Sequence, residues 1–367
     1  MTTELQIIQY LAAKLGAKME LESPIGGLRL YDKGFFYRLN AQKEVVYLKI
    51  SKCKLKEIPL EIAGLSHLET LELCWNGITL IENLDTFPQL KNLDLRDNKI
   101  TKIENLGNLP QLQTLKLSKN PIQCIENLEM LSALKELEIG ETKISKIEGL
   151  DKLLKLKVLK LYQNQITEIE NLDNLLKLQE LHLWRNEITD IKGLDKLTHL
   201  KELYLSSNKI TKLENLSALT QLQKVSFELN RISKIENLEK LTQLTYLHLS
   251  RNKITKIENL EKLTNLTQLY IGGKITKIEN LEALTSLSVL DLFDNKIKEI
   301  ENISSKNFPQ LRTVNLMRNK ITVLPRAFAF HHQIAIDLSH NPLVSPPYAI
   351  YEKGRVAMGQ WYEEQAG

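Results

Sequence analysis

The stretch Leu178-Gln-Glu-Leu-His-Leu-Trp-Arg-Asn-Glu-Ile188 decides the fold, because its frame, L-x-x-L-x-L-x-x-N-x-I, returns every 22 residues. The same frame holds from Leu200 to Ile210 and from Leu244 to Ile254, and about fourteen copies align along the chain. A fixed period of this length is typical of stacked units that share one continuous core. The sequence therefore predicts one solenoid domain at 367 residues rather than several globular ones.

Each copy contains a strand and a return segment. In the L-x-L part, apolar and polar residues alternate, which is typical of a short strand with one buried face. A second apolar series follows the Asn at wider spacing, for example Ile254, Ile257, Leu260 and Leu263, and indicates a turn or short helical return. We therefore expect an α/β fold, a curved right-handed coil with a parallel β-sheet on its concave face.

The Asn of the frame has a chemical reason to recur. A tight bend leaves backbone N–H and C=O groups unpaired inside the coil, and an amide side chain both donates and accepts hydrogen bonds. The sequence predicts a buried ladder, with Cys53 and Thr142 as smaller substitutes in the same position and a local defect at Gly272 and Gly273, where one copy is a residue short. The ladder comprises Asn76, Asn98, Asn120, Asn164, Asn186, Asn208, Asn230, Asn252, Asn295, Asn319 and Asn341.

The two ends of a solenoid expose apolar core and need caps. Residues 1–44 are predicted to form an N-terminal cap, a helix over residues 3–15 followed by short strands. Residues 45–343 are predicted to hold the repeats, and residues 344–367 a C-terminal helical cap interrupted at Gly354.

The 22-residue frame and the return segment K-I-E-N-L-E-K-L, at residues 234–241 and 256–263, together resemble a known family. They are similar to leucine-rich repeats of the Sds-twenty-two-like class, whose namesake is a regulatory subunit of protein phosphatase 1. The resemblance covers roughly residues 68–343 and implies a leucine-rich-repeat solenoid. The tail, Asn341-Pro-Leu-Val-Ser-Pro-Pro347 with Lys353-Gly-Arg-Val-Ala357, resembles instead the cap of intracellular Ras-like, plant and Roco-type leucine-rich-repeat proteins.

Composition narrows the function. A formal net charge of +4 is small beside 49 basic and 45 acidic residues, and it predicts no general affinity for nucleic acid. The sequence shows no secretion signal and no apolar run long enough to span a membrane, so we expect a cytoplasmic monomer without membrane association. Three cysteines without metal-type spacing, and no catalytic motif, favour a protein with no metal, no cofactor and no enzymatic activity.

Side chains between the buried leucines should lie on the concave face. Aromatic residues and Arg there resemble the anchors of protein interfaces. Alternatively, the rings pack flat over neighbouring strands and bind nothing. The first predicted protein-binding cluster comprises Tyr162, Glu180, His182, Trp184, Arg185, Glu202 and Tyr204, and the second comprises Tyr246, His248, Arg251, Tyr270 and Phe293.

Charged residues dominate this face closer to the N-terminus, with Trp75 as an expected exposed aromatic. They could steer a basic partner or could pair with one another, and the sequence leaves both interpretations open. They are Glu72, Asp94, Asp97, Arg96, Lys116, Lys119, Glu136, Glu138 and Glu141.

The leading functional hypothesis is a non-catalytic scaffold that binds a protein partner on the concave face. Three alternatives remain: a regulatory subunit of a phosphatase or other enzyme, an internalin-like surface adhesin, and the sensor arm of a larger multidomain protein. The sequence does not identify the partner.

Overall fold

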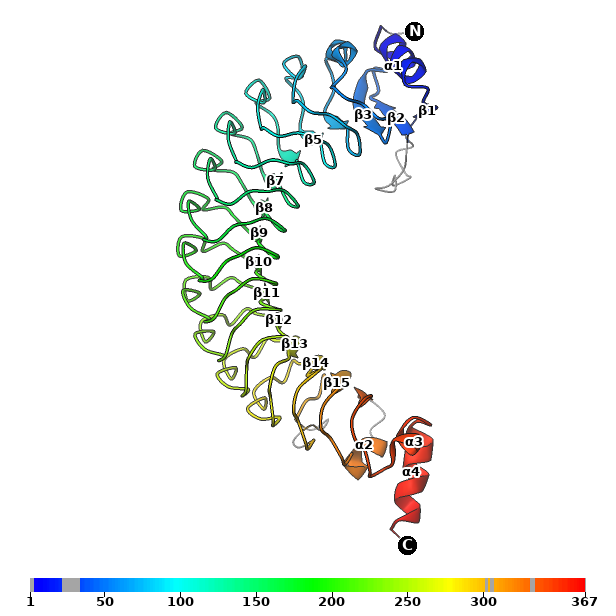
Figure 1. Cartoon of the computed structure of the whole chain (residues 1–367), viewed down its shortest axis with the longest axis vertical. Helices are drawn as coiled ribbons and strands as arrows, with labels where there is room; N and C mark the ends of the chain where they lie inside the picture. The colour runs from blue at the N-terminus through cyan, green and yellow to red at the C-terminus, as the bar shows by residue number, and fades with distance from the viewer. Residues whose placement is uncertain (1–2, 22–33, 301–302, 304–306, 331–333, 367) are drawn as a thin grey trace. The chain divides into compact units, whose positions relative to one another are not determined.

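The computed structural model describes residues 3–21, 34–300, 303, 307–330 and 334–366, and the chain divides into two compact units, Met1–Glu187 and Ile188–Gly367. Each unit is a run of leucine-rich coils, with a strand on one side and a return segment on the other (Figure 1). Both units therefore have the expected solenoid fold. Among the described residues, no helix combines the length and apolar character needed to cross a membrane.

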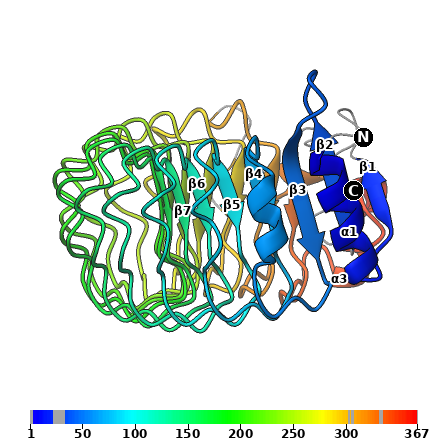
Figure 2. The ribbon, with the colours of Figure 1, turned by 90° about the horizontal axis from the view of Figure 1, so that it is seen from above.

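The first unit begins with a helix and continues as a sheet built largely of three-residue strands. Strand β2 pairs antiparallel with β3, and from β3 onward neighbouring strands run parallel in sequence order. Figure 2 shows β3 to β7 side by side, with α1 at the N-terminal end. The elements are α1 Thr3–Lys14, β1 Met19–Leu21, β2 Gly34–Leu39, β3 Val45–Ser51, η1 Leu60–Gly64, β4 Thr70–Glu72, β5 Asn92–Asp94, β6 Thr114–Lys116, β7 Glu136–Glu138, β8 Val158–Lys160 and β9 Glu180–His182.

The second unit continues with parallel strands and ends in short helices. Its register follows the repeat until Leu269 pairs with Leu290, because the intervening coil is one residue short. The elements are β10 Glu202–Tyr204, β11 Lys224–Ser226, β12 Tyr246–Leu249, β13 Gln268–Ile271, β14 Val289–Asp291, β15 Thr313–Asn315, α2 Arg326–Phe330, β16 Ala335–Asp337, α3 Tyr348–Tyr351 and α4 Arg355–Glu364.

The interior of each coil is filled from both of its sides. Leu181 and Leu183 contribute from the strand side and Ile169 and Leu172 from the return side, and none of them is more than 1% exposed. Each buried aliphatic side chain contributes about 1.5–3 kcal/mol relative to an exposed one. This burial offsets the entropy lost on ordering a coil that has little regular secondary structure.

The predicted ladder of Asn side chains is present. Asn186 Nδ2 donates to the carbonyl oxygens of Leu161 at 2.9 Å and Leu183 at 3.0 Å, and its Oδ1 accepts from Ile166 N at 3.0 Å. Each amide thus connects two consecutive coils, and Asn208 accepts from Ile188 N in the same way. The same pattern recurs at Asn76, Asn98, Asn120, Asn164, Asn230, Asn252, Asn295, Asn319 and Asn341.

The expected defect lies in the short coil. Gly273 occupies the space where other coils place the Asn, and its amide donates to Asn295 Oδ1 at 3.0 Å. A Cβ at Gly273 would come within 2.9 Å of Asn252 O and 3.0 Å of Ile254 O. The missing residue is therefore compensated by a close approach of backbones that only glycine permits.

A second ladder, which the strand frame did not predict, runs through the return segments. The Asn of each I-E-N-L motif has a positive φ, and its Nδ2 donates to a carbonyl of the preceding coil, as from Asn171 to Ile147 O at 2.7 Å. Gly149 and Gly193 take this position, also with positive φ, in two coils. The other members are Asn83, Asn105, Asn127, Asn215, Asn237, Asn259 and Asn280.

Replacing Asn171 by alanine is expected to lower the free energy of unfolding by about 2 kcal/mol, because the hydrogen bond is lost and alanine is disfavoured at a φ of 57°. Asn171→Gly keeps the backbone conformation accessible and should lose only about 1 kcal/mol. Urea unfolding of both variants measures the difference. Equal losses in the two variants would show that the backbone conformation contributes nothing.

Both ends of the chain are held by specific polar contacts. In the first unit, Glu4 of α1 accepts a 2.7 Å hydrogen bond from Val45 N, which anchors the helix to β3. In the second unit, the Tyr351 hydroxyl accepts from Leu338 N and donates to Ile336 O, so this ring closes the edge of β16. Gly354, at a φ of 89°, separates α3 from α4 as expected.

Candidate protein-binding face

The candidate site is the face of the strands that lies opposite the core, which we call the sheet face. In β9, for example, Leu181 is buried while Glu180 and His182 on either side are partly exposed. This alternation follows from the pleat of a strand, and it repeats in each coil. The side chains between the leucines therefore form columns from coil to coil.

In the first unit, Tyr162 and Trp184 form an aromatic pair on this face. Their rings are parallel within 1° and their centroids are 4.6 Å apart. The guanidinium of Arg185 lies 5.6 Å from the Trp184 ring, and Glu180 lies 3.6 Å from His182. The structure thus brings together the part of the first predicted cluster that belongs to this unit.

The position of the Tyr162 ring is fixed by three neighbours. A Cβ at residue 140 would lie 2.4 Å from the ring, so Gly140 leaves the space that the ring fills. The hydroxyl donates to Glu138 Oε1 at 3.0 Å, and Trp184 covers the ring. Burial, together with the nearby Glu138 charge, raises the pKa of Tyr162 to about 12, so the hydroxyl keeps its proton at neutral pH.

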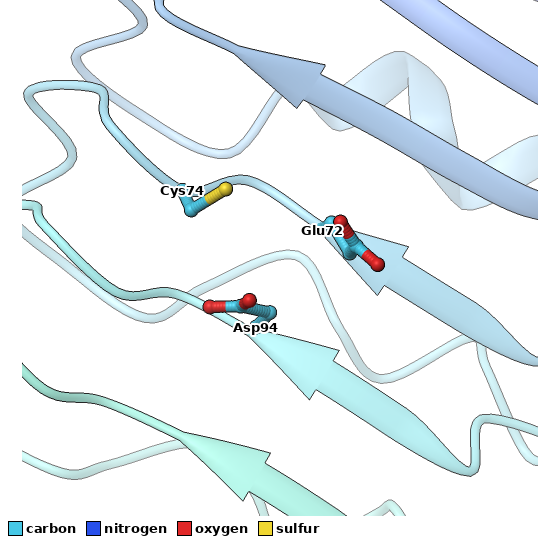
Figure 3. A group of neighbouring side chains, drawn as sticks. All are labelled: Glu72, Cys74 and Asp94. Carbon is cyan, nitrogen blue, oxygen red and sulfur yellow. The ribbon is translucent and has the colours of Figure 1, made fainter. Parts of the chain in front are cut away.

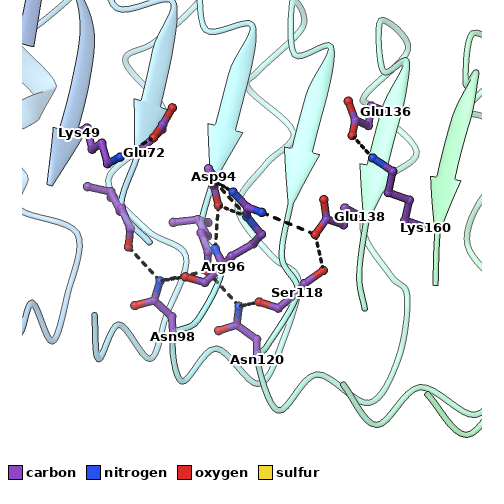
Figure 4. Close-up of polar contacts among 12 residues, drawn as sticks. Lys49, Glu72, Asp94, Arg96, Asn98, Ser118, Asn120, Glu136, Glu138 and Lys160 are labelled. Atoms are coloured by element: carbon purple, nitrogen blue, oxygen red, sulfur yellow. Dashed lines mark hydrogen bonds and ion pairs between the residues drawn. The ribbon is translucent and has the colours of Figure 1, made fainter. Parts of the chain in front are cut away.

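Glu138 is the centre of a polar network (Figure 4). Its residue surface is only 6% exposed, and Oε1 accepts hydrogen bonds from both Tyr162 and Ser118, the latter at 2.9 Å. Arg96 Nη1 lies 3.9 Å from the same oxygen, while its Nη2 forms a 2.6 Å ion pair with Asp94. Sequence reasoning named Glu138 only as one charge among several.

Other charges on this face pair across neighbouring strands. Lys160 donates to Glu136 at 2.8 Å, and Lys119 lies 3.7 Å from Glu141. Burial opposes the shift, but the bond from Lys160 lowers the pKa of Glu136 below its ordinary value. These contacts agree with the interpretation of mutual pairing.

A hollow of about 200 Å³ opens on the sheet face of the first unit. Tyr162 and Trp75 border it on the two sides. Trp75 was expected to be exposed, but it is half-buried, and Lys52 Nζ lies 5.4 Å from the centroid of its ring. We call it the Glu138 hollow, lined by Trp75, Arg96, Asp97, Ser118, Lys119, Glu138, Glu141 and Tyr162.

The second unit has its own aromatic cluster, formed by Tyr246, His248 and Tyr270. The Tyr270 ring centroid lies 5.4 Å from that of Tyr246 and 4.9 Å from that of His248. The Tyr246 hydroxyl and His248 Nδ1 are 3.2 Å apart. Burial lowers the pKa of His248 although Glu228 and Asp291 oppose the shift, so the imidazole is neutral at pH 7.

The remaining predicted residues of this unit form contacts of their own. Arg251 is exposed and its Nε lies 3.9 Å from Glu228, whereas Phe293 lies 5.6 Å from the guanidinium of Arg318. Tyr204 donates to Glu202 at 2.6 Å, and Glu202 also pairs with Lys224. Each of these side chains is on the sheet face or at its margin.

The described residues include one group with metal-type ligand atoms, Glu72, Cys74 and Asp94 (Figure 3). Lys49 Nζ lies 3.8 Å from Glu72, and Arg96 donates to both oxygens of Asp94. Burial raises the pKa of Cys74 to about 12, which disfavours the thiolate that a metal needs. The two carboxylates are thus already matched by cations, and the group has the character of an ion-pair cluster.

Comparison with known proteins agrees with this architecture. Family models described as leucine-rich repeats match residues 88–130, 176–218, 220–262 and 242–284, and another matches residues 285–343. The chain is a leucine-rich-repeat protein. No curated protein has a significant sequence match to it.

Solved structures with the same fold include bacterial proteins and receptors. An internalin from Listeria monocytogenes is 28% identical, with a TM-score of 0.71 over 78% of this chain and 84% of the internalin. Toll in the Drosophila Toll–Spatzle complex is 20% identical, with a TM-score of 0.65 over 78% of this chain and 46% of the other. A TLR13–ssRNA13 complex is 22% identical, with a TM-score of 0.64 over 82% of this chain and 51% of the other.

Proposed function

We propose that this chain is a non-catalytic scaffold that binds a protein partner on its sheet face. Leucine-rich-repeat domains are in general interaction domains without catalytic activity, and the fold supports this general assignment. The observation that carries the proposal is the Tyr162–Trp184 pair, two large stacked rings that are each partly exposed on the sheet face. Aromatic side chains held in one conformation lose little entropy on binding and form typical interface anchors.

The second unit supplies a further anchor in Tyr246, His248 and Tyr270. Their polar atoms bond to one another and to Gln268, so the rings are positioned while remaining partly exposed. The sheet face carries charges of both signs that largely pair with one another, whereas an RNA-binding surface would carry an excess of cations. A protein partner therefore suits this face better than a nucleic acid.

Replacing both Tyr162 and Trp184 by alanine is expected to weaken binding of the partner at least tenfold, because the largest anchor of the first unit is removed. Affinity capture from a native extract of the source cells, followed by mass spectrometry, identifies proteins retained by the natural chain. Titration of the retained protein then measures the dissociation constant of each variant.

The matched control is Tyr10→Ala, which removes an exposed tyrosine from α1, away from the sheet face. It should leave affinity unchanged, and thermal unfolding should confirm that every variant is folded. Unaltered affinity of the double variant would contradict the proposal. Retention of RNA in place of protein would indicate an RNA-binding function instead.

The likeness to an internalin, at 28% identity, favours a surface adhesin as the second candidate. We propose the cytoplasm as the location, and the two functions differ on this point. Antibody labelling of intact and permeabilised source cells distinguishes them. Labelling without permeabilisation would favour the adhesin.

A further inference from the structure

We propose that the Glu138 hollow receives an arginine side chain of the protein partner. This inference rests on the proposed function, since it assumes a partner on the sheet face of the first unit. It adds the chemistry of the contact, a guanidinium held by carboxylates beside aromatic rings.

The residues that line the hollow carry one more carboxylate than cations. Asp97, Glu138 and Glu141 contribute three carboxylates, against the two cations of Arg96 and Lys119. Arg96 places Nε and Nη2 on Asp94, at 2.6–3.1 Å. Lys119 faces Glu141.

Two carboxylates of the hollow, those of Glu138 and Asp97, can accept further hydrogen bonds from a ligand. Among the described residues, all polar contacts of the Glu138 carboxylate go to Oε1, and Oε2 has none. Glu138 is also one of the residues that line the hollow. Asp97 takes part in no ion pair within that part of the chain. A carboxylate that is more than nine-tenths buried with one open oxygen is a strong acceptor for a charged donor.

Size and shape favour arginine. The hollow of about 200 Å³ has room for several water-sized groups, comparable with a guanidinium and its alkyl stem. The guanidinium is planar and always charged, and it stacks on aromatic rings such as Trp75, which lines the hollow, while donating in its own plane. An anionic group would instead meet the Glu138 and Glu141 charges, because Arg96 is already bonded to Asp94.

The test uses a random peptide library displayed on phage and selected against the full chain. We expect arginine to be enriched in the selected peptides. Each peptide is then synthesised with arginine and with citrulline, its neutral analogue of nearly equal shape. Citrulline should weaken binding to the natural chain at least tenfold but should have little further effect on the Glu138→Gln variant, whose own affinity is already reduced.

Controls separate this contact from others. Glu129→Gln changes an exposed carboxylate on a return segment. It should leave unchanged the difference in affinity between the arginine and citrulline peptides, which we call the arginine dependence. Glu141→Gln, at a partly exposed residue, should reduce the dependence by a smaller factor, and it keeps the test valid if Glu138→Gln unfolds. Thermal unfolding checks each variant.

Three results would overturn the arginine site: no arginine enrichment, a citrulline effect of equal size in the natural and Glu138→Gln chains, or selection of acidic peptides. The proposed function is judged separately by the Tyr162 and Trp184 double variant. If that variant loses its partner while the arginine dependence is absent, the scaffold stands and only the arginine contact is wrong.

Discussion

Replacing Asn186 by alanine is expected to lower the free energy of unfolding by about 3–4 kcal/mol, the largest single effect among our predictions. The amide makes three hydrogen bonds to backbone groups of two coils and is 5% exposed. Alanine would leave Leu161 O and Ile166 N without this partner inside the coil. A buried unsatisfied backbone group costs about 1–3 kcal/mol, more than the bond contributes when it is made.

A control within the same ladder is to introduce an Asn at a ladder position that lacks one. Thr142 occupies the Asn position, and its hydroxyl donates to Asn164 Oδ1. Thr142→Asn should gain contacts of the kind that Asn186 makes and stabilise the chain by about 1 kcal/mol. Urea unfolding of both variants measures the two effects. A loss below about 1 kcal/mol for Asn186→Ala would mean that water replaces the amide without penalty.

Replacing Gly273 by alanine is expected to cost about 3 kcal/mol. The added Cβ would come within 2.9–3.1 Å of Asn252 O, Ile254 O and Ile254 N, all of them backbone atoms that cannot move independently. Gly107→Ala is the matched control, since its nearest neighbour is Met130 Cγ at 3.8 Å, an ordinary contact. Thermal and urea unfolding compare the two variants, and equal stability would show that the short coil has room to relax.

Much of the fold could be predicted because the pattern repeats. Leucine spacing identified the strands, and the chemistry of the amide side chain identified the first ladder. The second ladder was missed although its signal is present, an Asn or Gly at one fixed place in each I-E-N-L motif. Asn or Gly is favoured at this position because the backbone there has a positive φ. The spacing of the apolar residues does not indicate backbone conformation.

The candidate site was predicted at the level of the face and not of its contacts. The period placed Tyr162 and Trp184 on the same side of the sheet, but their stacking depends on the space left by Gly140, a residue in another coil. Glu136 and Glu138 are alike in sequence, yet the first pairs with Lys160 and the second is buried under Tyr162. Such differences depend on the side-chain rotamers of residues in neighbouring coils, and the spacing of residues in the sequence does not specify these rotamers.

The two ladders also constrain how the gene can change in length. Duplication or deletion of a 22-residue coding segment joins one coil to another that offers the same carbonyl acceptors, so recombination can add or remove whole coils between Leu71 and Leu159 without a mismatch. Each such event moves Trp75 relative to Tyr162 by one strand spacing, about 4.8 Å. An insertion or deletion of a single codon lacks this tolerance, because it shifts the leucine and Asn positions of the coil by one residue. The short coil at Gly272 and Gly273 accommodates such a difference only through a close approach of backbones.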